Sequence, residues 1–142
     1  MRILLAVDGS RHALDAVKCL VEHLDWYHGK PTVELVTVHP PVPQLPGLGS
    51  VVGRSQLKRY YEEEGAEALA QAKKLLEGAG VSYAAQVLVG EAAERIVRHA
   101  ESARCDLIYI GNRGMSAVAN LLIGSVASKV LQLASVPVML VK

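Results

Sequence analysis

The sequence alternates between short apolar runs and longer stretches in which apolar residues recur every three or four positions. The first such pair is Ile3–Val7, then, after the Asp8–Ser10 break, apolar positions from Ala13 to Leu24. Continuous apolar runs are typical of strands buried on both faces, and the longer spacing is typical of amphipathic helices. The first pair therefore predicts a strand followed by a helix, with the Ser10 hydroxyl as its N-cap.

The same alternation continues along the chain. Further strands are predicted at Val33–Val38, Tyr83–Val89, Leu107–Ile110 and Val136–Val141, and further helices at Leu57–Ala79, Ala93–Ala100 and Gly124–Leu133. Pro40–Gly53 and Gly111–Ile123 are predicted loops, the second with room for one helical turn. This order favours one α/β domain over residues 1–142, with a parallel sheet, right-handed crossovers and helices on both faces.

Composition excludes several classes of protein. An apolar fraction of 51% excludes intrinsic disorder. The 15 Lys and Arg against 14 Asp and Glu leave a net charge of +1, and aromatic residues are only 4% with no Phe. A nucleic-acid-binding surface, which needs a basic excess or stacking platforms, is therefore not expected.

The cysteines and apolar runs predict a cytoplasmic protein. Cys19 and Cys105 lack the spacing of a disulfide framework or zinc site and are expected to be reduced. Asp8 interrupts the first apolar run after five residues, so we expect no signal peptide. No run approaches the ~20 apolar residues that span a bilayer, so no membrane partner is expected.

Ligands of open parallel sheets bind at the carboxyl ends of the strands. The candidate loops are therefore Asp8–Ser10, the segment from His39, Gly90-Glu91 and the segment from Gly111. The last of these contains a glycine pattern: Gly111-Asn112-Arg113-Gly114, nine residues, then Gly124-Ser125. Glycine lets backbone approach a ligand, and a helix beginning at Gly124-Ser125 offers N–H groups and a positive dipole end to phosphate. The pattern differs from a P-loop, because no Gly-Lys-Ser/Thr follows.

This glycine pattern resembles the ATP-binding signature of the universal stress protein family. The opening Ile-Leu-Leu-Ala-Val-Asp-Gly-Ser, the Val89–Ala92 turn and the closing Val-Pro-Val-Met-Leu-Val are similar to that family as well. The resemblance covers essentially the whole chain. It implies a Rossmann-like sheet of order 3-2-1-4-5, an adenine nucleotide as ligand (ATP, ADP or AMP, with or without magnesium), a role in stress response and a homodimer.

The resemblance also implies roles for individual residues. The adenosine side comprises Ala6, Asp8, Val38, Ile110 and Gly111, with Asp8 suited to the ribose hydroxyls and the Val38 backbone to the adenine edge. The phosphate side comprises Gly114, Gly124, Ser125 and Val126. The protein alone supplies no metal site, although Asp8 could contact nucleotide-bound magnesium.

Two positions depart from the family pattern. Ala127 stands where some nucleotide-binding members carry Thr or Ser, which removes one hydroxyl from the phosphate side, and Ser128 is one residue too far along the helix to replace it. The order Thr37-Val38-His39-Pro40 also differs from the commoner His-Val order. This second departure leaves the Val38 assignment open by one residue.

Several candidate residues have a structural alternative. Asp8 could order the helix start instead of binding ribose, and Arg113 could be a solvated loop charge instead of a phosphate ligand. His39 fits a partly exposed histidine better than a general base. Glu22, His23, Asp25 and His28 gather near a helix end, but the histidines are five residues apart rather than the four of a helical zinc site. Glu62-Glu63-Glu64 is typical of a solvated helix face.

The candidate functions belong to different classes. The first is a nucleotide-binding sensor or regulator, the second a slow ATPase or phosphoryl-transfer enzyme, and the third a dimeric scaffold without nucleotide. The sequence indicates no hydrolase triad and no catalytic residue, so we do not expect the protein to be an enzyme. The apolar last strand, placed at a sheet edge by the family order, predicts antiparallel pairing of two copies. Residues 107–142 contain three basic and no acidic residues, which suits one phosphate chain.

Overall fold

The computed structural model describes residues 1–43, 53–114 and 122–142. Most of the predicted Pro40–Gly53 loop and of the Gly111–Ile123 loop, including its expected helical turn, lies outside the described residues.

Five parallel strands form one sheet with the order β3-β2-β1-β4-β5, which confirms the fold predicted from the sequence. The strands are β1 (Arg2–Ala6), β2 (Thr32–His39), β3 (Tyr83–Val89), β4 (Leu107–Gly111) and β5 (Val138–Val141). Because β1 pairs with both β2 and β4, the strand order reverses beside it. This reversal is the switch point at which such sheets open a crevice.

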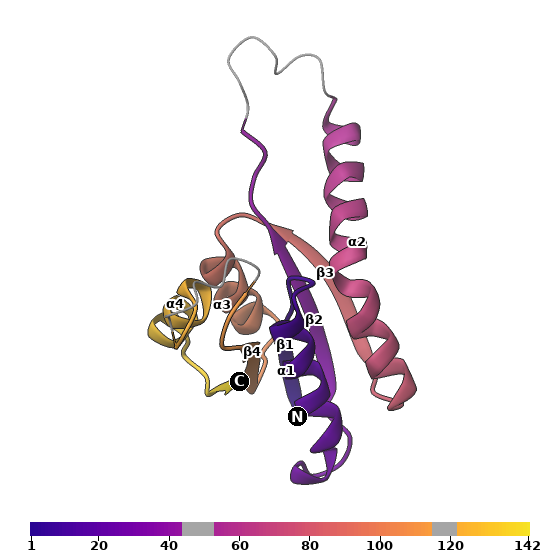
Figure 1. Cartoon of the computed structure of the whole chain (residues 1–142), viewed down its shortest axis with the longest axis vertical. Coiled ribbons are helices and arrows are strands. Elements are labelled where there is room, and N and C mark those ends of the chain that lie inside the picture. Colours follow the sequence, from indigo (N-terminus) through magenta and orange to yellow (C-terminus); the bar gives the residue numbers. More distant parts are fainter. Residues whose placement is uncertain (44–52, 115–121) are drawn as a thin grey trace.

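The helices cover both faces of the sheet (Figure 1). They are α1 (Arg11–Glu22), α2 (Arg54–Gly78), α3 (Ala92–Ser102) and α4 (Ser125–Leu133), with a short 3-10 helix, η1, at Leu24–Trp26. Helices α1 and α2 pack on one face, α3 and α4 on the other. The N-terminal part of α2 extends past the end of the sheet (Figure 1).

Apart from β3, the element boundaries differ from the prediction by one to three residues, and two of these differences are informative. The first helix ends at Glu22, so Leu24 belongs to η1 rather than to α1. The last strand begins at Val138 instead of Val136, because Pro137 has no N–H to give to a ladder; its carbonyl oxygen accepts from the Ile108 N–H at 3.0 Å.

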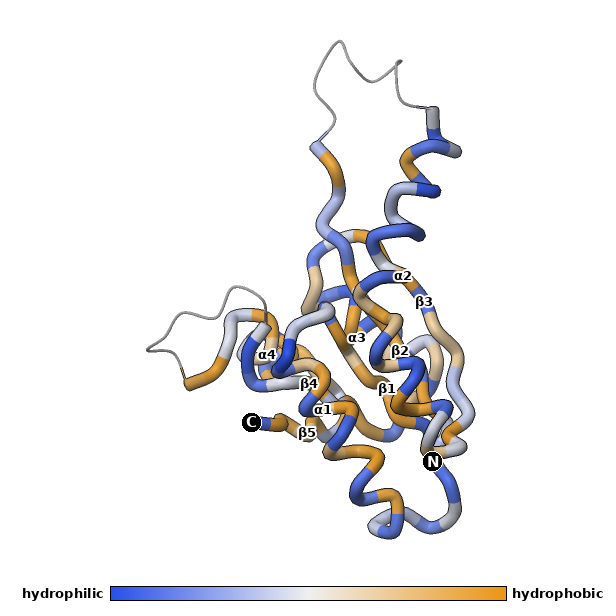
Figure 2. Tube along the Cα trace, turned by 45° about the vertical axis from the view of Figure 1, so that its right-hand side comes forward, coloured by the Kyte–Doolittle hydropathy of each residue, from blue (hydrophilic) through white to orange (hydrophobic). Residues whose placement is uncertain are grey.

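The core explains why the strand sequences are continuously apolar. Along β1, Ile3 and Leu5 pack towards α1 and α2, whereas Leu4 and Ala6 pack towards α3 and α4. Figure 2 shows the apolar strands enclosed by helices whose outer residues are hydrophilic. The side chains from Ile3 to Ala6 are buried, so both faces of the central strand lie in the core.

One glycine at the switch point has a packing role. A Cβ built on Gly111, at the end of β4, would lie 2.6 Å from the carbonyl oxygen of His12 in the first turn of α1. Any side chain there would push α1 off the sheet. The first glycine of the motif therefore sets the distance between β4 and α1.

Candidate functional site

A cavity of about 930 Å³ lies at the carboxyl ends of the strands, around the switch point. All ten residues predicted to contact the nucleotide line it: Ala6, Asp8, Val38, Ile110, Gly111, Arg113, Gly114, Gly124, Ser125 and Val126. These residues come from β1 and the loop after it, β2, β4, the loop after β4 and the start of α4. Their contact with a ligand stays a prediction, but the fold brings them to one space.

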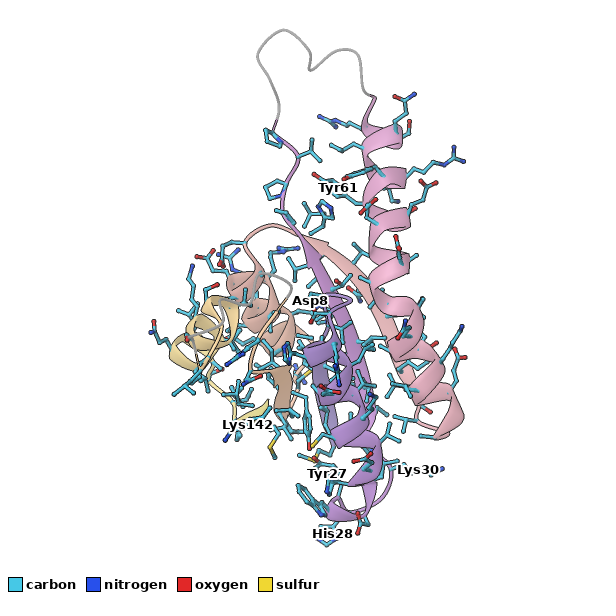
Figure 3. The ribbon with its side chains drawn as sticks, viewed as in Figure 1. Asp8, Tyr27, His28, Lys30, Tyr61 and Lys142 are labelled. Carbon is cyan, nitrogen blue, oxygen red and sulfur yellow. The ribbon has the colours of Figure 1, made fainter. Side chains whose placement is uncertain are left out.

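Asp8 follows β1 and orders the turn into α1. Its Oδ1 accepts a hydrogen bond from the Ser10 N–H at 2.9 Å, and the Ser10 hydroxyl in turn accepts from the Ala13 N–H at 3.2 Å. Ser10 is therefore the helix cap, as predicted, and Asp8 supports it. Because Asp8 also lines the cavity, the structural and ligand-binding alternatives for this residue are compatible (Figure 3).

The two halves of the glycine motif are joined by hydrogen bonds. The Gly124 N–H donates to the Asn112 carbonyl oxygen at 2.6 Å, and the Asn112 side-chain amide donates to the Leu122 carbonyl oxygen at 3.1 Å. A Cβ on Gly124 would lie 3.3 Å from both Asn112 O and Arg113 Cα. The close approach of the two segments thus holds Arg113 beside the start of α4.

The start of α4 has the properties of an anion site. Its N-cap is Gly124, which gives no side-chain hydrogen bond to the first turn. Within residues 1–43, 53–114 and 122–142, no side chain caps the N–H groups of that turn, so they are left for another acceptor, and the positive end of the helix dipole adds to them. Ser125 and Val126, the first two residues of the helix, both line the cavity.

Arg113 supplies a second observation that fits an anionic group. This side chain lines the cavity and is partly buried, and its Nε is buried without a hydrogen-bond partner in the described part of the chain. A buried donor without an acceptor is costly unless a ligand satisfies it. Arg113 is therefore not simply a solvated loop charge.

The positive charge of residues 107–142 is not all directed at the cavity. Lys129 pairs with Glu91 and Glu94 of the α3 start, at 3.4 and 3.5 Å, and of the three basic residues only Arg113 lines the cavity. Two acidic residues, Asp8 and Glu64, also line the cavity. The cavity is therefore less positively charged than the three basic residues of the segment 107–142 predicted.

The turn at Gly90-Glu91 is not part of the cavity wall, contrary to the prediction. Glu91 instead caps α3, accepting from the Glu94 N–H at 2.9 Å. That hydrogen bond, with the nearby Lys129 ammonium, lowers the pKa of the Glu91 carboxyl. From this loop region the cavity receives Ala92 and Ile96 of α3 instead.

The end of β2 forms the opposite wall. Val38 lines the cavity as predicted, together with Thr37 and His39. The His39 ring packs against Tyr60 and Tyr61 of α2, with ring centroids 5.5 and 5.2 Å apart. Its Nδ1 lies 2.7 Å from the Pro40 carbonyl oxygen. Because a carbonyl only accepts, Nδ1 carries the proton, and in the neutral ring Nε2 is an acceptor.

Sequence reasoning missed the contribution of α2. Glu64 and Gly65 line the cavity, and Glu64 had been interpreted only as part of a solvated helix face. A Cβ on Gly65 would lie 2.2 Å from Cγ2 of Val87 in β3, so only glycine allows α2 to pack this closely. An isolated glycine inside a helical pattern was the signal for this close approach.

The remaining candidates lie away from the cavity. His23 contacts the Cys19 carbonyl oxygen through Nδ1 at 2.8 Å and packs on Trp26, so its ring is engaged locally. Cys19 and Cys105 are free thiols. Burial raises the pKa of Cys105 to about 11. Within the described ranges, no helix is long and apolar enough to cross a membrane.

Comparisons with known proteins agree on one family. The model of the universal stress protein family matches residues 1–142. The chain is 35% identical over 141 residues to the universal stress protein MJ0531 of Methanocaldococcus jannaschii, covering 99% of this chain and 81% of that relative.

Solved structures share the fold. The structure of MJ0577 from Methanocaldococcus jannaschii superposes with a TM-score of 0.83 at 29% identity, covering 99% of this chain and 94% of the other. A universal stress protein from Archaeoglobus fulgidus in complex with dAMP gives a TM-score of 0.66 at 26% identity, covering 100% of this chain and 98% of the other.

Proposed function

This chain belongs to the universal stress protein family, and from that premise we propose that it binds an adenine nucleotide in the switch-point cavity and acts as a sensor or regulator in stress response. The observation that carries the proposal is the convergence of all ten predicted residues on one cavity. The phosphates would lie at the start of α4 beside Arg113, the ribose near Asp8 and the base near the end of β2.

Two further points support a nucleotide as ligand. The buried Nε of Arg113 and the N-terminus of α4, which has no side-chain cap, are both donors that phosphate oxygens satisfy. The Archaeoglobus fulgidus relative, similar in fold and sequence, was solved with dAMP. Magnesium would enter with the phosphates, and Asp8 is the carboxylate we expect beside it.

A regulatory role is favoured over catalysis by the chemistry of the cavity wall. Phosphoryl transfer needs a positioned base or nucleophile and cationic stabilisation of the transferred group. His39 is held against Pro40 and two tyrosines at the far end from α4, and Arg113 is the one Lys or Arg side chain on the described cavity wall. Slow ATP hydrolysis is the second candidate, favoured only by the presence of Asp8 near the expected phosphates.

The experiment is to denature the freshly purified protein and identify the released nucleotide by chromatography. Recovered ATP supports a binder that does not hydrolyse it, whereas ADP or AMP, followed by turnover of added ATP, supports the second candidate. If no nucleotide is released and added ATP, ADP and AMP all fail to raise the melting temperature, the nucleotide proposal is wrong and a scaffold role is favoured.

Gly114→Val provides the matched variant. A Cβ at Gly114 would lie 2.7 Å from Oδ2 of Asp8, so a valine displaces the carboxylate and narrows the cavity at the phosphate side. We expect at least a tenfold loss of nucleotide affinity in calorimetry with little change in the unfolding of the free protein, because Gly114 lies in a loop. Unchanged affinity would contradict the phosphate-side assignment.

We also propose that the protein is a homodimer whose two copies pair along β5. This strand is the edge of the sheet, and its four residues are only partly buried in one copy. Pairing would cover an apolar edge that otherwise invites aggregation.

A further inference from the structure

The cavity has a direction that follows from the strand order. The lining residues of the loop after β4 and of the α4 start lie at one end, those of β1 in the middle and those of β2 at the other. Helix α2 joins the β2 end, since Tyr60 and Tyr61 pack on His39. Neighbouring strands are ~4.8 Å apart, so β4 and β2 are separated by ~10 Å. A nucleotide whose phosphate binds at α4 therefore extends past Asp8 and brings its base to the end of β2.

The wall around this base position is mainly apolar. Val36 and Val38 of β2 and Ile96 of α3 line it, with Ala92 and Pro40 nearby. Apolar walls accept any planar base but do not distinguish one from another. Discrimination at this end must therefore come from the Val38 backbone, assigned above to the adenine edge, and from the few polar side chains.

Two of those polar groups are hydrogen-bond acceptors. The first is the Glu64 carboxylate, which has no ion-pair or hydrogen-bond partner in the described ranges, unlike Glu62, which pairs with Lys58. The second is Nε2 of His39 in the neutral form of the ring, since Nδ1–H donates to the Pro40 carbonyl oxygen. An end lined by acceptors favours a base that presents hydrogen-bond donors.

The backbone at Glu64, whose side chain is exposed, is fixed by packing. Gly65, the next residue, is buried against Val87, so the α2 backbone is held against β3 at this turn. Tyr61, one turn earlier, is also held in place. Its hydroxyl accepts a hydrogen bond from the Val42 N–H at 2.7 Å, which joins α2 to the chain after β2 (Figure 3). The helix turn that carries Glu64 is thus held from both sides.

We propose that Glu64 is a specificity-determining residue of the nucleotide site, whose carboxylate accepts a hydrogen bond from the exocyclic amino group of the base. This inference rests on the proposed function and adds a subsite at its base end. The carboxylate also repels the phosphate of any nucleotide, so its effect on total affinity is mixed. Its signature is therefore the difference between two ligands that differ only in the amino group.

The test measures binding of AMP and of purine riboside 5′-monophosphate, which lacks the amino group, by calorimetry. Native protein should prefer AMP by about tenfold, as expected for one charge-assisted hydrogen bond at a partly solvated site. In Glu64→Ala the preference should fall to about twofold or less, because repulsion of the phosphate changes equally for both ligands and cancels in the ratio.

Glu63→Ala is the matched control. Both glutamates are exposed on α2, but Glu63 does not line the cavity, so its substitution removes the same charge and should leave the tenfold preference intact. A preference that persists in Glu64→Ala, or that is lost equally in Glu63→Ala, overturns the inference while the nucleotide site stands. If the native protein binds neither ligand nor ATP, the proposed function itself fails and the inference with it.

Discussion

At the scale of single residues, three glycines of this chain are required for different reasons, which the sequence alone does not distinguish. A Cβ at Gly111 would meet the backbone of α1, one at Gly65 the side chain of Val87, and one at Gly114 the carboxylate of Asp8. Of these neighbours, only Asp8 is a residue assigned to the ligand. The motif glycines therefore combine a folding role with a binding role, and substitutions separate the two.

Gly65→Ala should destabilise the fold. Alanine gains up to ~1 kcal/mol of helix propensity over glycine, but its Cβ would overlap the Val87 side chain at 2.2 Å, inside a packed interface. Overpacking of this kind costs about 1–3 kcal/mol, so we expect a net loss of stability in urea unfolding. The displacement of α2 should also weaken nucleotide binding, because Glu64 moves with the helix.

Gly78→Ala is the control within the same helix. It is the last residue of α2, and a Cβ there meets nothing within 4 Å. Its free energy of unfolding should stay unchanged or rise by up to ~1 kcal/mol. If Gly65→Ala were as stable as Gly78→Ala, the close packing of α2 on β3 would not be a constraint on this chain.

At the scale of elements, a tyrosine pair joins the chain after η1 to the central part of the sheet. Tyr109 of β4 is fully buried, and its hydroxyl is hydrogen-bonded to that of Tyr27, which is half-buried. Burial, together with this bond, raises the pKa of the Tyr109 hydroxyl well above its ordinary value. The phenol therefore stays neutral and needs a hydrogen-bond partner inside the protein.

Removing the two hydroxyls one at a time should have unequal effects. Tyr27→Phe leaves the buried Tyr109 hydroxyl without a partner, which costs about 1–3 kcal/mol of unfolding free energy. Tyr109→Phe leaves the half-buried Tyr27 hydroxyl, which can turn to water, so we expect a cost of about 1 kcal/mol or less. Chemical denaturation of both variants and of the double variant checks the order. Equal losses would show that Tyr109 finds another partner.

The elements also show what the sequence could and could not predict. Periodicity located every strand and helix because each buries a whole face, and the signal of a buried face is spread over many residues. Glu64 was not predicted to line the cavity because its place there depends on how closely α2 packs on β3. That distance is set by Gly65 and Val87, which lie 22 residues apart in the sequence. The prediction that Gly90-Glu91 lines the cavity was wrong because a turn at the correct edge of the sheet can still face a helix. The Glu91 carboxylate contacts the start of α3 and Lys129 instead.

At the scale of the whole molecule, the sheet ends in an unprotected edge. Ile108 N–H donates to the Pro137 oxygen and Asn112 N–H to the Val141 oxygen, so by alternation the backbone groups of Val138 and Leu140 point outwards. The side chains of β5 are all partly buried, with Met139 and Val141 packed against the α1 and α2 core. The edge thus offers both backbone hydrogen bonds and apolar surface to a second copy.

Met139→Lys should separate the proposed dimer without unfolding the monomer. In an antiparallel pair about a two-fold axis, the lysines of the two copies come close together near the centre of this four-residue strand, and like charges across such a pair are destabilising. The flexible lysine stem can still cover the core while its ammonium reaches water. We expect native protein to sediment as a dimer at micromolar concentration and the variant as a monomer.

Ala70→Lys is the control. It adds the same charge to an exposed position of α2, which packs at the other end of the strand order, and it should leave the dimer intact. Native protein that sediments as a monomer would refute pairing through β5, and loss of the dimer in both variants would show that net charge, rather than the edge, controls association.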